Sequence, residues 1–364
     1  MPWEIALFSF IRYRRHPTIE TTIVAVTFIA ALLTITFVVT GREDAPPQPN
    51  DELPGSWEIL ASGTTANLAD IVFVDSENGW VVGDGGAILH TSDGGNTWVR
   101  QDSGVKTKLA KVTFSDLENG WVVGNLGVIV HTSNGGDTWE LQRSESTIGL
   151  DLIGVQFDDE RKGWVMAARG SILLRTIDGG KFWSRESFGN PSNRSDMAFL
   201  DFQRGWVVFT GGNLAHTSDA GTSWEYVPGV APGANIGTNG VFFLDETHGW
   251  IAGWRGRTAS IQSGLQFNSF LTDGMIALTT DGGISWIRQD SGTGRFLWDV
   301  AFVDTQEGWA VGSFGTILYS RDGGVTWELQ YSGTEEILQS MVFIDKTLGW
   351  AVGEGGVILR YRRQ

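Results

Sequence analysis

The feature that most constrains this chain is a repeat that occurs seven times. A Gly-Trp pair recurs about every 40 residues, and a phenylalanine stands seven positions before each tryptophan. Within a repeat, short β-rich runs alternate with glycine turns, as in FVDSENGWVVGDGGAILHTSDGGNTW at residues 73–98. This period is typical of a β-propeller whose repeats each form one four-stranded blade. The sequence therefore predicts an all-β, seven-bladed β-propeller, with its Gly-Trp tryptophans at Trp80, Trp121, Trp164, Trp206, Trp250, Trp309 and Trp350.

The turn before the last strand of most repeats reads S/T-x-D-G-G-x-T/S-W, which matches the Asp-box, or bacterial neuraminidase repeat. Its carboxylate can accept hydrogen bonds from turn amides, and its glycines tolerate positive φ. Asn134 replaces the carboxylate in the second repeat and can make most of the same bonds. This favours a structural role, although a calcium-binding or catalytic role is the alternative. The box positions are Asp93, Asn134, Asp178, Asp219, Asp281 and Asp322.

The seventh repeat lacks a fourth strand at its C-terminal end. The sequence GSWEIL at residues 55–60 resembles the fourth-strand sequence TWELQ at residues 326–330. We therefore expect the N-terminal strand of the propeller to complete the last blade, which closes the ring and removes its exposed strand edges.

A hydrophobic segment precedes the propeller. Residues 21–40 contain no charged residue, and at about 1.5 Å per residue a helix of this length spans a hydrocarbon core of about 30 Å. Arginines precede it and acidic residues follow it, so the positive-inside rule places the N-terminus in the cytoplasm and the propeller outside. We expect an uncleaved, single-pass signal anchor; a cleaved signal peptide is the rival interpretation.

The remaining organisation follows from composition. Residues 1–20 form the expected cytoplasmic segment, residues 41–55 a proline-rich acidic linker, and residues 56–364 the propeller, which we expect to be monomeric. The net charge of −16 argues against nucleic acid as a partner. With no cysteine in the chain, the fold uses no disulfides.

The seven GW-[VIA]-[VA]-G runs, the I-L-x-[HYR]-[TS]-x-D-G-G turns and the closing W-E-I-L together resemble the photosystem II stability and assembly factor family, over residues 56–361. The resemblance implies a propeller without enzymatic activity that holds a newly made reaction-centre subunit during assembly. We therefore expect a binding scaffold for a protein client, a subunit of a membrane complex.

The alternative function is an Asp-box glycoside hydrolase of the sialidase type, or a carbohydrate-binding propeller. Glycosidases need paired carboxylates at the substrate, and sialidases use a tyrosine nucleophile. The propeller tyrosines, however, fall on expected third or fourth strands, away from the central channel. We expect no cofactor and no metal, because His90, His131 and His216 share one repeat position and are spread around the ring.

One insertion breaks the repeat. In the fifth repeat, the distance from Gly-Trp to the Asp-box is 18 residues longer than in the first. It joins the expected second and third strands, on the face opposite the Asp-box turns. Its aromatic and arginine side chains are typical of a protein-binding surface, although they could instead pack the loop onto its own blade. With neighbours on the same face, the candidate partner-binding residues are Trp254, Arg255, Arg257, Phe267, Phe270, Arg169, Arg295, Phe296, Trp298 and Phe314.

Overall fold

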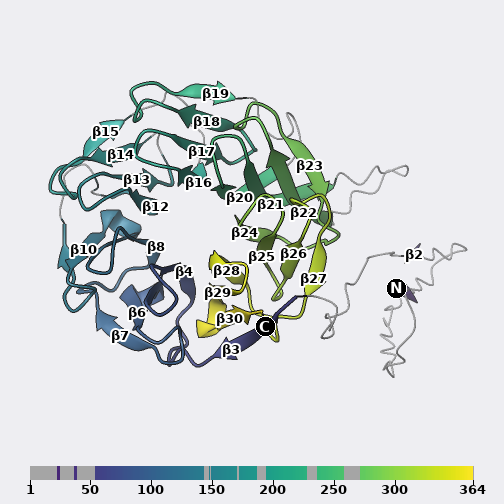
Figure 1. Ribbon diagram of the computed structural model, residues 1–364, viewed down its shortest axis with the longest axis horizontal. Coiled ribbons are helices and arrows are strands. Elements are labelled where there is room, and N and C mark those ends of the chain that lie inside the picture. Colours follow the sequence, from purple (N-terminus) through teal and green to yellow (C-terminus); the bar gives the residue numbers. More distant parts are fainter. Residues whose placement is uncertain are drawn as a thin grey trace, which may run out of the picture. The chain divides into compact units, whose positions relative to one another are not determined.

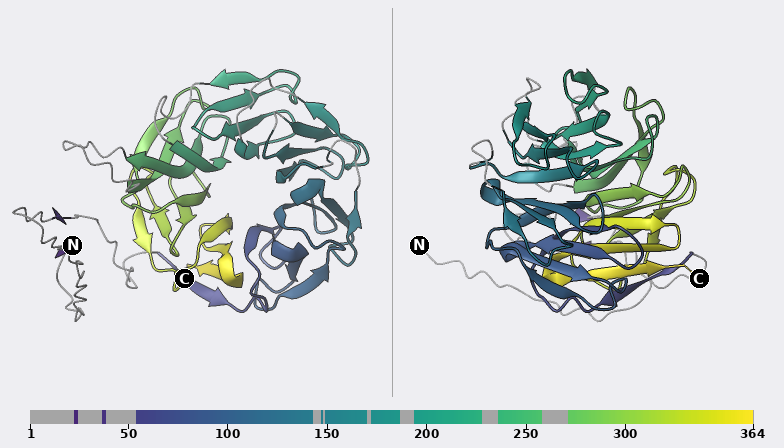
Figure 2. Two further views of the ribbon diagram at one scale, coloured as in Figure 1. Left: turned by 180° about the vertical axis from the view of Figure 1, so that it is seen from behind. Right: turned by 60° about the vertical axis from the view of Figure 1, so that its left-hand side comes forward.

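Seven antiparallel sheets of four strands form a closed ring (Figure 1). The computed structural model describes residues 54–142, 147, 149–169, 172–186, 194–227, 236–257 and 271–363, together with two short strands nearer the N-terminus. In each sheet the first strand of the repeat lies at the centre and the fourth at the rim, as Figure 2 shows from behind and from the side. The prediction of a seven-bladed propeller is confirmed.

The blades are numbered in the order of the repeats. Blade 1 contains β4 (Leu68–Phe73), β5 (Gly79–Gly83), β6 (Ala87–Thr91) and β7 (Val99–Asp102), and blade 2 contains β8 (Leu109–Phe114), β9 (Asn119–Gly124), β10 (Ile129–Ser133) and β11 (Glu140–Leu141). Blade 3 contains β12 (Leu152–Phe157), β13 (Gly163–Ala167), β14 (Leu173–Thr176) and β15 (Ser184–Glu186), and blade 4 contains β16 (Arg194–Phe199), β17 (Gly205–Phe209), β18 (Leu214–Thr217) and β19 (Glu225–Val227).

The second half of the ring follows the same order. Blade 5 contains β20 (Ile236–Phe243), β21 (Gly249–Arg257), β22 (Leu271–Thr279) and β23 (Ile287–Asp290), and blade 6 contains β24 (Leu297–Phe302), β25 (Gly308–Gly312), β26 (Ile317–Ser320) and β27 (Glu328–Gln330). Blade 7 contains β28 (Leu338–Asp345), β29 (Leu348–Gly353), β30 (Ile358–Arg362) and β3 (Ser56–Leu60). Three short 3-10 turns, η1 (Asp84–Gly86), η2 (Asn125–Gly127) and η3 (Glu354–Gly356), join second and third strands.

The repeated phenylalanine and Gly-Trp pair hold neighbouring blades together. Phe73 faces Gly79 across the β4–β5 pair, and a Cβ at Gly79 would lie 2.5 Å from the Phe73 ring, so only glycine fits there. The adjacent Trp80 is 1% exposed and stacks on Phe114 of blade 2, with 3.7 Å between ring centroids. An equivalent pair joins every blade to the next: Trp121–Phe157, Trp164–Phe199, Trp206–Phe243, Trp250–Phe302, Trp309–Phe343 and Trp350–Phe73.

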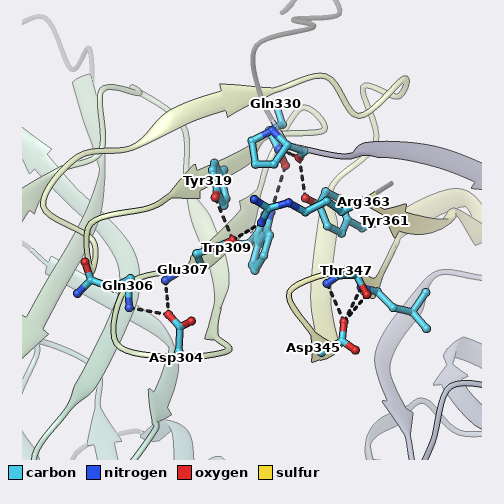
Figure 3. Close-up of polar contacts among 12 residues, drawn as sticks. Asp304, Gln306, Glu307, Trp309, Tyr319, Gln330, Asp345, Thr347, Tyr361 and Arg363 are labelled. Carbon is cyan, nitrogen blue, oxygen red and sulfur yellow. Dashed lines mark hydrogen bonds and ion pairs between the residues drawn. The ribbon is translucent and has the colours of Figure 1, made fainter.

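The N-terminal strand completes blade 7, as the sequence predicts. Strand β3 pairs with β30 along its whole length, with Trp57 opposite Tyr361. The Tyr361 hydroxyl donates to the Pro54 carbonyl at 2.6 Å. At the junction with blade 6, Glu307 accepts hydrogen bonds from the Tyr319 hydroxyl at 3.1 Å and from Arg363 Nη1 at 2.7 Å (Figure 3). The two ends of the propeller chain are thus fixed to each other and to the neighbouring blade.

Nearer the N-terminus, the structure describes only β1 (Ile23–Val24) and β2 (Phe37–Val38), which pair antiparallel. These four residues belong to the range expected as a transmembrane helix and lie in strands; the rest of residues 21–40 lies outside the described residues. In the part of the chain that the structure describes, no helix is both long and apolar enough to cross a bilayer.

Candidate functional site

Each inner strand carries a β-bulge near its start, where the strand reaches the face formed by the turns between second and third strands. The bulge places one extra residue in the inner strand without a partner in the second strand. The seven register shifts lie at equivalent positions of β4, β8, β12, β16, β20, β24 and β28. The extra residues all line one cavity: Ala69, Ala110, Ile153, Ser195, Asn239, Trp298 and Gln339.

This cavity of about 600 Å³ is the opening of the central channel, and we call it the channel mouth. Its wall also contains residues from the turns between second and third strands, such as Asn125, Arg169 and Thr210. Two tryptophans, Trp254 and Trp298, supply its large aromatic surface. Since bulges often aim side chains into binding sites, the repeated backbone feature marks the mouth as the candidate site.

A ring of polar side chains lies one residue further along the inner strands. Lys111 Nζ lies 3.1 Å from Asp70 Oδ1, and Lys111 lines both the mouth and a second cavity of about 500 Å³ on the other side of the ring. Asp196 and Asp299 line the same two cavities. The centre of the channel therefore holds three carboxylates and one ammonium group.

The three carboxylates connect neighbouring blades. Asp70 Oδ2 accepts from the Val112 amide of blade 2 at 2.9 Å. Likewise, Asp196 Oδ2 accepts from the Val241 amide of blade 5 at 3.0 Å. Asp299 Oδ2 accepts from the Met341 amide of blade 7 at 2.9 Å. These bonds occupy the amides that follow the bulges, which would otherwise be buried without a partner.

Burial and the neighbouring charges have opposite effects on the pKa of three groups in this ring. Burial raises the pKa of Asp196 to about 6, against the opposing attraction of Lys111. Burial also raises the pKa of Asp299. For Lys111, burial favours the neutral amine, but the attraction of Asp70, Asp196 and Asp299 outweighs it and raises the pKa above its usual range. The Lys111 ammonium group therefore stays charged. Its single positive charge offsets only part of the negative charge of the three carboxylates around it.

The structure brings three predicted partner-binding residues together at the mouth: Arg169, Trp254 and Trp298. Trp254 lies against Gly237, where a Cβ would approach the indole nitrogen to 2.0 Å, and meets Phe296 edge-on with 5.5 Å between ring centroids. Phe296 thus supports the wall of the mouth from blade 6. Arg169 is exposed on blade 3.

Other predicted residues lie outside this wall. Arg295 Nη1 donates to the Phe314 carbonyl at 3.2 Å, and its guanidinium lies 5.7 Å from the centre of the Phe314 ring. The insertion of blade 5 extends β21 and β22 to nine residues each, so Arg255 lies within a strand, opposite Asp273. Arg257 ends β21, and Phe267 and Phe270 lie outside the described residues.

The Asp-box residues are on the opposite face, where they form turns. Asp93 Oδ1 accepts from the Thr97 amide at 2.8 Å, and Oδ2 accepts from the Thr97 hydroxyl at 2.7 Å. Asn134 Oδ1 likewise accepts from the Thr138 amide, at 3.0 Å. The Thr97 hydrogen bonds lower the pKa of Asp93, which leaves it ionised and unsuited to act as a general acid. Asp178, Asp219, Asp281 and Asp322 accept from their turns in the same way. Among the described residues, no group of His, Asp and Glu could hold a metal ion.

Sequence reasoning missed the polar ring of the channel. Its signal is a charged residue inside an otherwise apolar inner-strand run, as in LADIVF, LAKVTF and LWDVAF. A charged group is rarely buried without a partner, so Asp70, Lys111 and Asp299 could have been flagged as facing one another. The bulges themselves leave no such signal in the sequence.

The comparisons with known proteins point to one family. The family model described as Photosynthesis system II assembly factor YCF48 matches residues 50–149, 141–241 and 285–362. The Photosystem II assembly lipoprotein Ycf48 of Synechococcus sp. (strain CC9902) is 23% identical over 291 residues, covering 72% of this chain and 74% of that protein. Other relatives match over short stretches: the chain spans 21% of the photosystem II stability/assembly factor HCF136 of Oryza sativa subsp. japonica, at 32% identity over 22% of the chain.

Two solved structures share the fold. "YCF48 bound to D1 peptide" has a TM-score of 0.70 and 22% sequence identity, covering 88% of this chain and 100% of that chain. "YCF48 from Cyanidioschyzon merolae" has a TM-score of 0.67 and 20% identity, covering 84% of this chain and 99% of that chain. At these identities the likeness shows the propeller architecture.

Proposed function

Because the chain belongs to the photosynthesis system II assembly factor YCF48 family, which is not a family of enzymes, we propose that it is a membrane-anchored scaffold whose channel mouth binds a protein client. The client is a subunit of a membrane complex, which the scaffold helps to assemble or to keep stable. The observation that carries this proposal is the channel mouth itself: one cavity to which all seven blades contribute a bulged residue.

The lining of the mouth suits a polypeptide. Trp254 and Trp298 offer planar apolar surface, and the exposed cations Lys108 and Arg169 stand beside them. Tryptophan and arginine are the side chains that most often carry binding energy in protein interfaces. The two tryptophans are partly buried before any partner binds, so little side-chain entropy remains to be lost on binding.

The class of client is supported by a relative. One solved YCF48 structure holds a D1 peptide, and this chain aligns with the whole of that structure. A peptide ligand on the same fold favours a protein segment over a sugar. For this chain we propose the same class of ligand, an extended segment of a membrane-complex subunit.

Membrane attachment is supported by a different observation. Relatives from Synechococcus and Prochlorococcus are named lipoproteins. This chain has no cysteine to carry a thioether-linked lipid. We propose that the hydrophobic segment at residues 21–40 replaces the lipid, with the N-terminus in the cytoplasm and the propeller on the extracytoplasmic side. Residues 41–55 then serve as a stalk.

The test compares two matched pairs of substitutions. Trp254→Ala with Arg169→Ala removes an aromatic and a cationic side chain from the mouth. Phe182→Ala with Lys181→Ala removes the same two types of side chain from the Asp-box face of blade 3, where both are exposed. The full-length proteins are purified in mild detergent from their own membranes, and the co-purifying membrane-complex subunits are quantified by mass spectrometry.

We expect the mouth variant to weaken client binding by about 2 kcal/mol and the control pair to leave it unchanged. Melting temperatures of all proteins should stay within a few degrees of wild type. Equal recovery of the client by both variants would exclude the mouth as the binding site.

A further inference from the structure

Three residues other than glycine adopt the left-handed backbone conformation in the described part of the chain. They are Leu126 (φ 60°), Ala220 (φ 58°) and Phe314 (φ 56°). A side chain in this conformation brings Cβ too close to the following carbonyl oxygen, so the position favours glycine. A bulky residue is retained there only when something offsets that cost.

Leu126 and Phe314 occupy the same position of the repeat. Both lie in the turn between second and third strands, in blades 2 and 6. In blades 1 and 7 the same position holds Gly85 (φ 68°) and Gly355 (φ 66°), so the turn forms readily with glycine. The leucine and phenylalanine are therefore not needed to build the turn.

Burial does not offset the cost either. Leu126 is 67% exposed and Phe314 is 65% exposed. Both side chains thus leave most of their apolar surface in water, in a backbone conformation that disfavours them. Folding alone does not account for either residue, whereas a partner that covers them would.

Both residues flank the channel mouth. Asn125, which precedes Leu126, lines the mouth, and Trp254 of its wall contacts Phe296, close to Arg295 and Phe314. In the order of the ring, blades 2 and 6 are separated by two blades on one side and three on the other, so a straight segment that touches both must cross the mouth.

The charged side chains along this path are of both signs. The mouth presents Lys108 and Arg169 but also Asp151, and Arg295 lies beside Phe314. The centre of the channel holds three carboxylates and one ammonium group. Polar side chains that donate and accept hydrogen bonds, placed between two apolar ones, therefore suit this path better than acidic side chains.

We propose that Leu126 and Phe314 are contact residues for an extended client segment that crosses the channel mouth, with an apolar side chain at each end and polar side chains between them. This inference rests on the proposed function and adds the two outer contacts and the chemistry of the segment. A lipid surface is the other kind of partner that exposed leucine and phenylalanine fit. The net charge of −16 opposes approach to anionic headgroups and favours the polypeptide.

The first experiment places a photo-cross-linking amino acid singly at positions 126, 314, 108 and 220 of the full-length protein in its own membranes. Position 108 reports on the mouth, and position 220 lies on the Asp-box face. We expect positions 126 and 314 to cross-link to one client polypeptide, at sites a few residues apart, and position 220 to give no such product.

The outcomes separate this inference from the proposed function. Client products at position 108 with none, or only lipid products, at positions 126 and 314 would overturn the inference and leave the proposed function standing. No client product at any of positions 108, 126 and 314 would overturn both.

The second experiment uses glycine, which removes the side chain and relieves the backbone at once. Leu126→Gly and Phe314→Gly should each reduce recovery of the cross-linked client, reported from position 108, by about fivefold or more. Their melting temperatures should equal or exceed that of wild type, because glycine suits these dihedral angles. Ala220→Gly, the matched change on the other face, should leave recovery unchanged. Full recovery in both glycine variants would show that the client does not depend on these side chains, and a clear loss of stability would show that they serve the fold; either result would overturn the inference.

Discussion

At the scale of single residues, the ring depends on a few side chains that repeat their contacts in every blade. In every blade the Gly-Trp tryptophan stacks on the phenylalanine of the next blade, as Trp80 does on Phe114. In five blades its indole nitrogen also donates to a glycine carbonyl of the next Asp-box, as Trp80 does to Gly135 at 3.2 Å, so the box glycines also serve the blade interface. Trp164 donates instead to the Phe202 carbonyl, and Trp309 to Gln330 Oε1. The polar ring in the channel adds a second set of contacts between blades.

The Asp-box carboxylates should be replaceable by amides. We expect Asp93→Asn to change the free energy of unfolding by less than about 0.5 kcal/mol, because Asn134 already accepts from its turn amide in blade 2. Asp93→Ala should cost about 1 kcal/mol, since the Thr97 amide and hydroxyl lose their acceptor. Urea denaturation followed by tryptophan fluorescence measures both. A glycoside-hydrolysing activity abolished by Asp93→Asn would contradict the structural role.

The buried tryptophans should be far more sensitive. Trp121 is fully buried and stacks on Phe157 with 3.6 Å between ring centroids. Trp121→Ala should destabilise the ring by about 3–5 kcal/mol through the cavity it leaves. Thermal unfolding of the variant should shift accordingly, and a shift no larger than that of Asp93→Ala would refute this role of the stack.

The channel carboxylates should give the propeller a distinct pH dependence. Asp196 has its pKa raised by burial from 3.8 to about 6, so the folded state holds this proton more tightly than the unfolded state. That contribution to stability is complete below about pH 4 and is lost as the pH rises through 6. Asp196→Asn removes it. We therefore expect the variant to gain about 1 kcal/mol relative to wild type between pH 4.5 and pH 7.5, after allowance for the partial exposure of the side chain to the channel.

Asp93→Asn is the matched control for this pH series. The Thr97 hydrogen bonds lower the pKa of Asp93, so its contribution is present above pH 3.8 and is lost as the pH falls. Between pH 4.5 and pH 7.5 the stability difference between Asp93→Asn and wild type should therefore stay constant, while Asp196→Asn gains stability relative to wild type. Parallel pH profiles would show that Asp196 is not stabilised in its neutral form.

At the scale of strands and blades, the sequence specifies what is repeated and leaves open what departs from the repeat. The number of blades, the four strands of each blade and the closing role of β3 follow from the spacing of tryptophans and from the match of Trp57 to Trp327. The bulges could not be foreseen, since the residues that they insert, from Ala69 in blade 1 to Trp298 in blade 6, share no side-chain type that would mark an extra residue in the strand. The predicted insertion is partly strand, because β21 and β22 continue their pairing to Arg257 and Leu271.

The candidate site was predictable in part, because some of its residues depart visibly from the repeat. Trp254 and Trp298 stood out because they are absent from the repeat pattern, and both line the mouth. Arg295 and Phe314 lie beside each other, and local packing pairs the guanidinium with the ring; that they bind a partner stays a prediction. Lys111 could have been expected at the channel as well, because the closed ring was predicted and a charged side chain in an apolar inner strand needs a partner there.

Closure by β3 should be essential for cooperative folding. Removing residues 56–60 leaves blade 7 with three strands and exposes the edge of β30. We expect a broadened, early thermal transition and aggregation on heating. A matched loss of chain elsewhere, the removal of residues 258–270 between β21 and β22, should leave the transition cooperative. A sharp transition at the wild-type temperature after removal of β3 would contradict the closing role.

At the scale of the whole molecule, an acidic propeller is proposed to stand away from the membrane on a short stalk. The net charge of −16 on the whole chain opposes direct contact with anionic lipids, which supports the hydrophobic segment as the proposed means of attachment. Such an arrangement keeps the channel mouth accessible to a membrane-complex subunit while it holds the scaffold at the membrane.

Deletion of residues 21–40 tests this arrangement. The shortened protein should move from the membrane fraction, where it resists alkaline washing, to the soluble fraction. Its melting temperature should be unchanged, because the ring from β3 to β30 is intact. Retention in the washed membrane fraction would show that another part of the chain binds the bilayer.

The seven bulges also affect how a bound client segment would be rotated on the ring. Their backbones are nearly equivalent, so a mouth with identical side chains would offer a client seven rotated poses of equal energy, a degeneracy equivalent to RT ln 7, about 1.1 kcal/mol. The bulged residues are instead alanine in blades 1 and 2, isoleucine, serine and asparagine in blades 3 to 5, tryptophan in blade 6 and glutamine in blade 7. The symmetry of the scaffold is thereby broken at the proposed binding surface, which favours one angular setting of a bound segment on the ring.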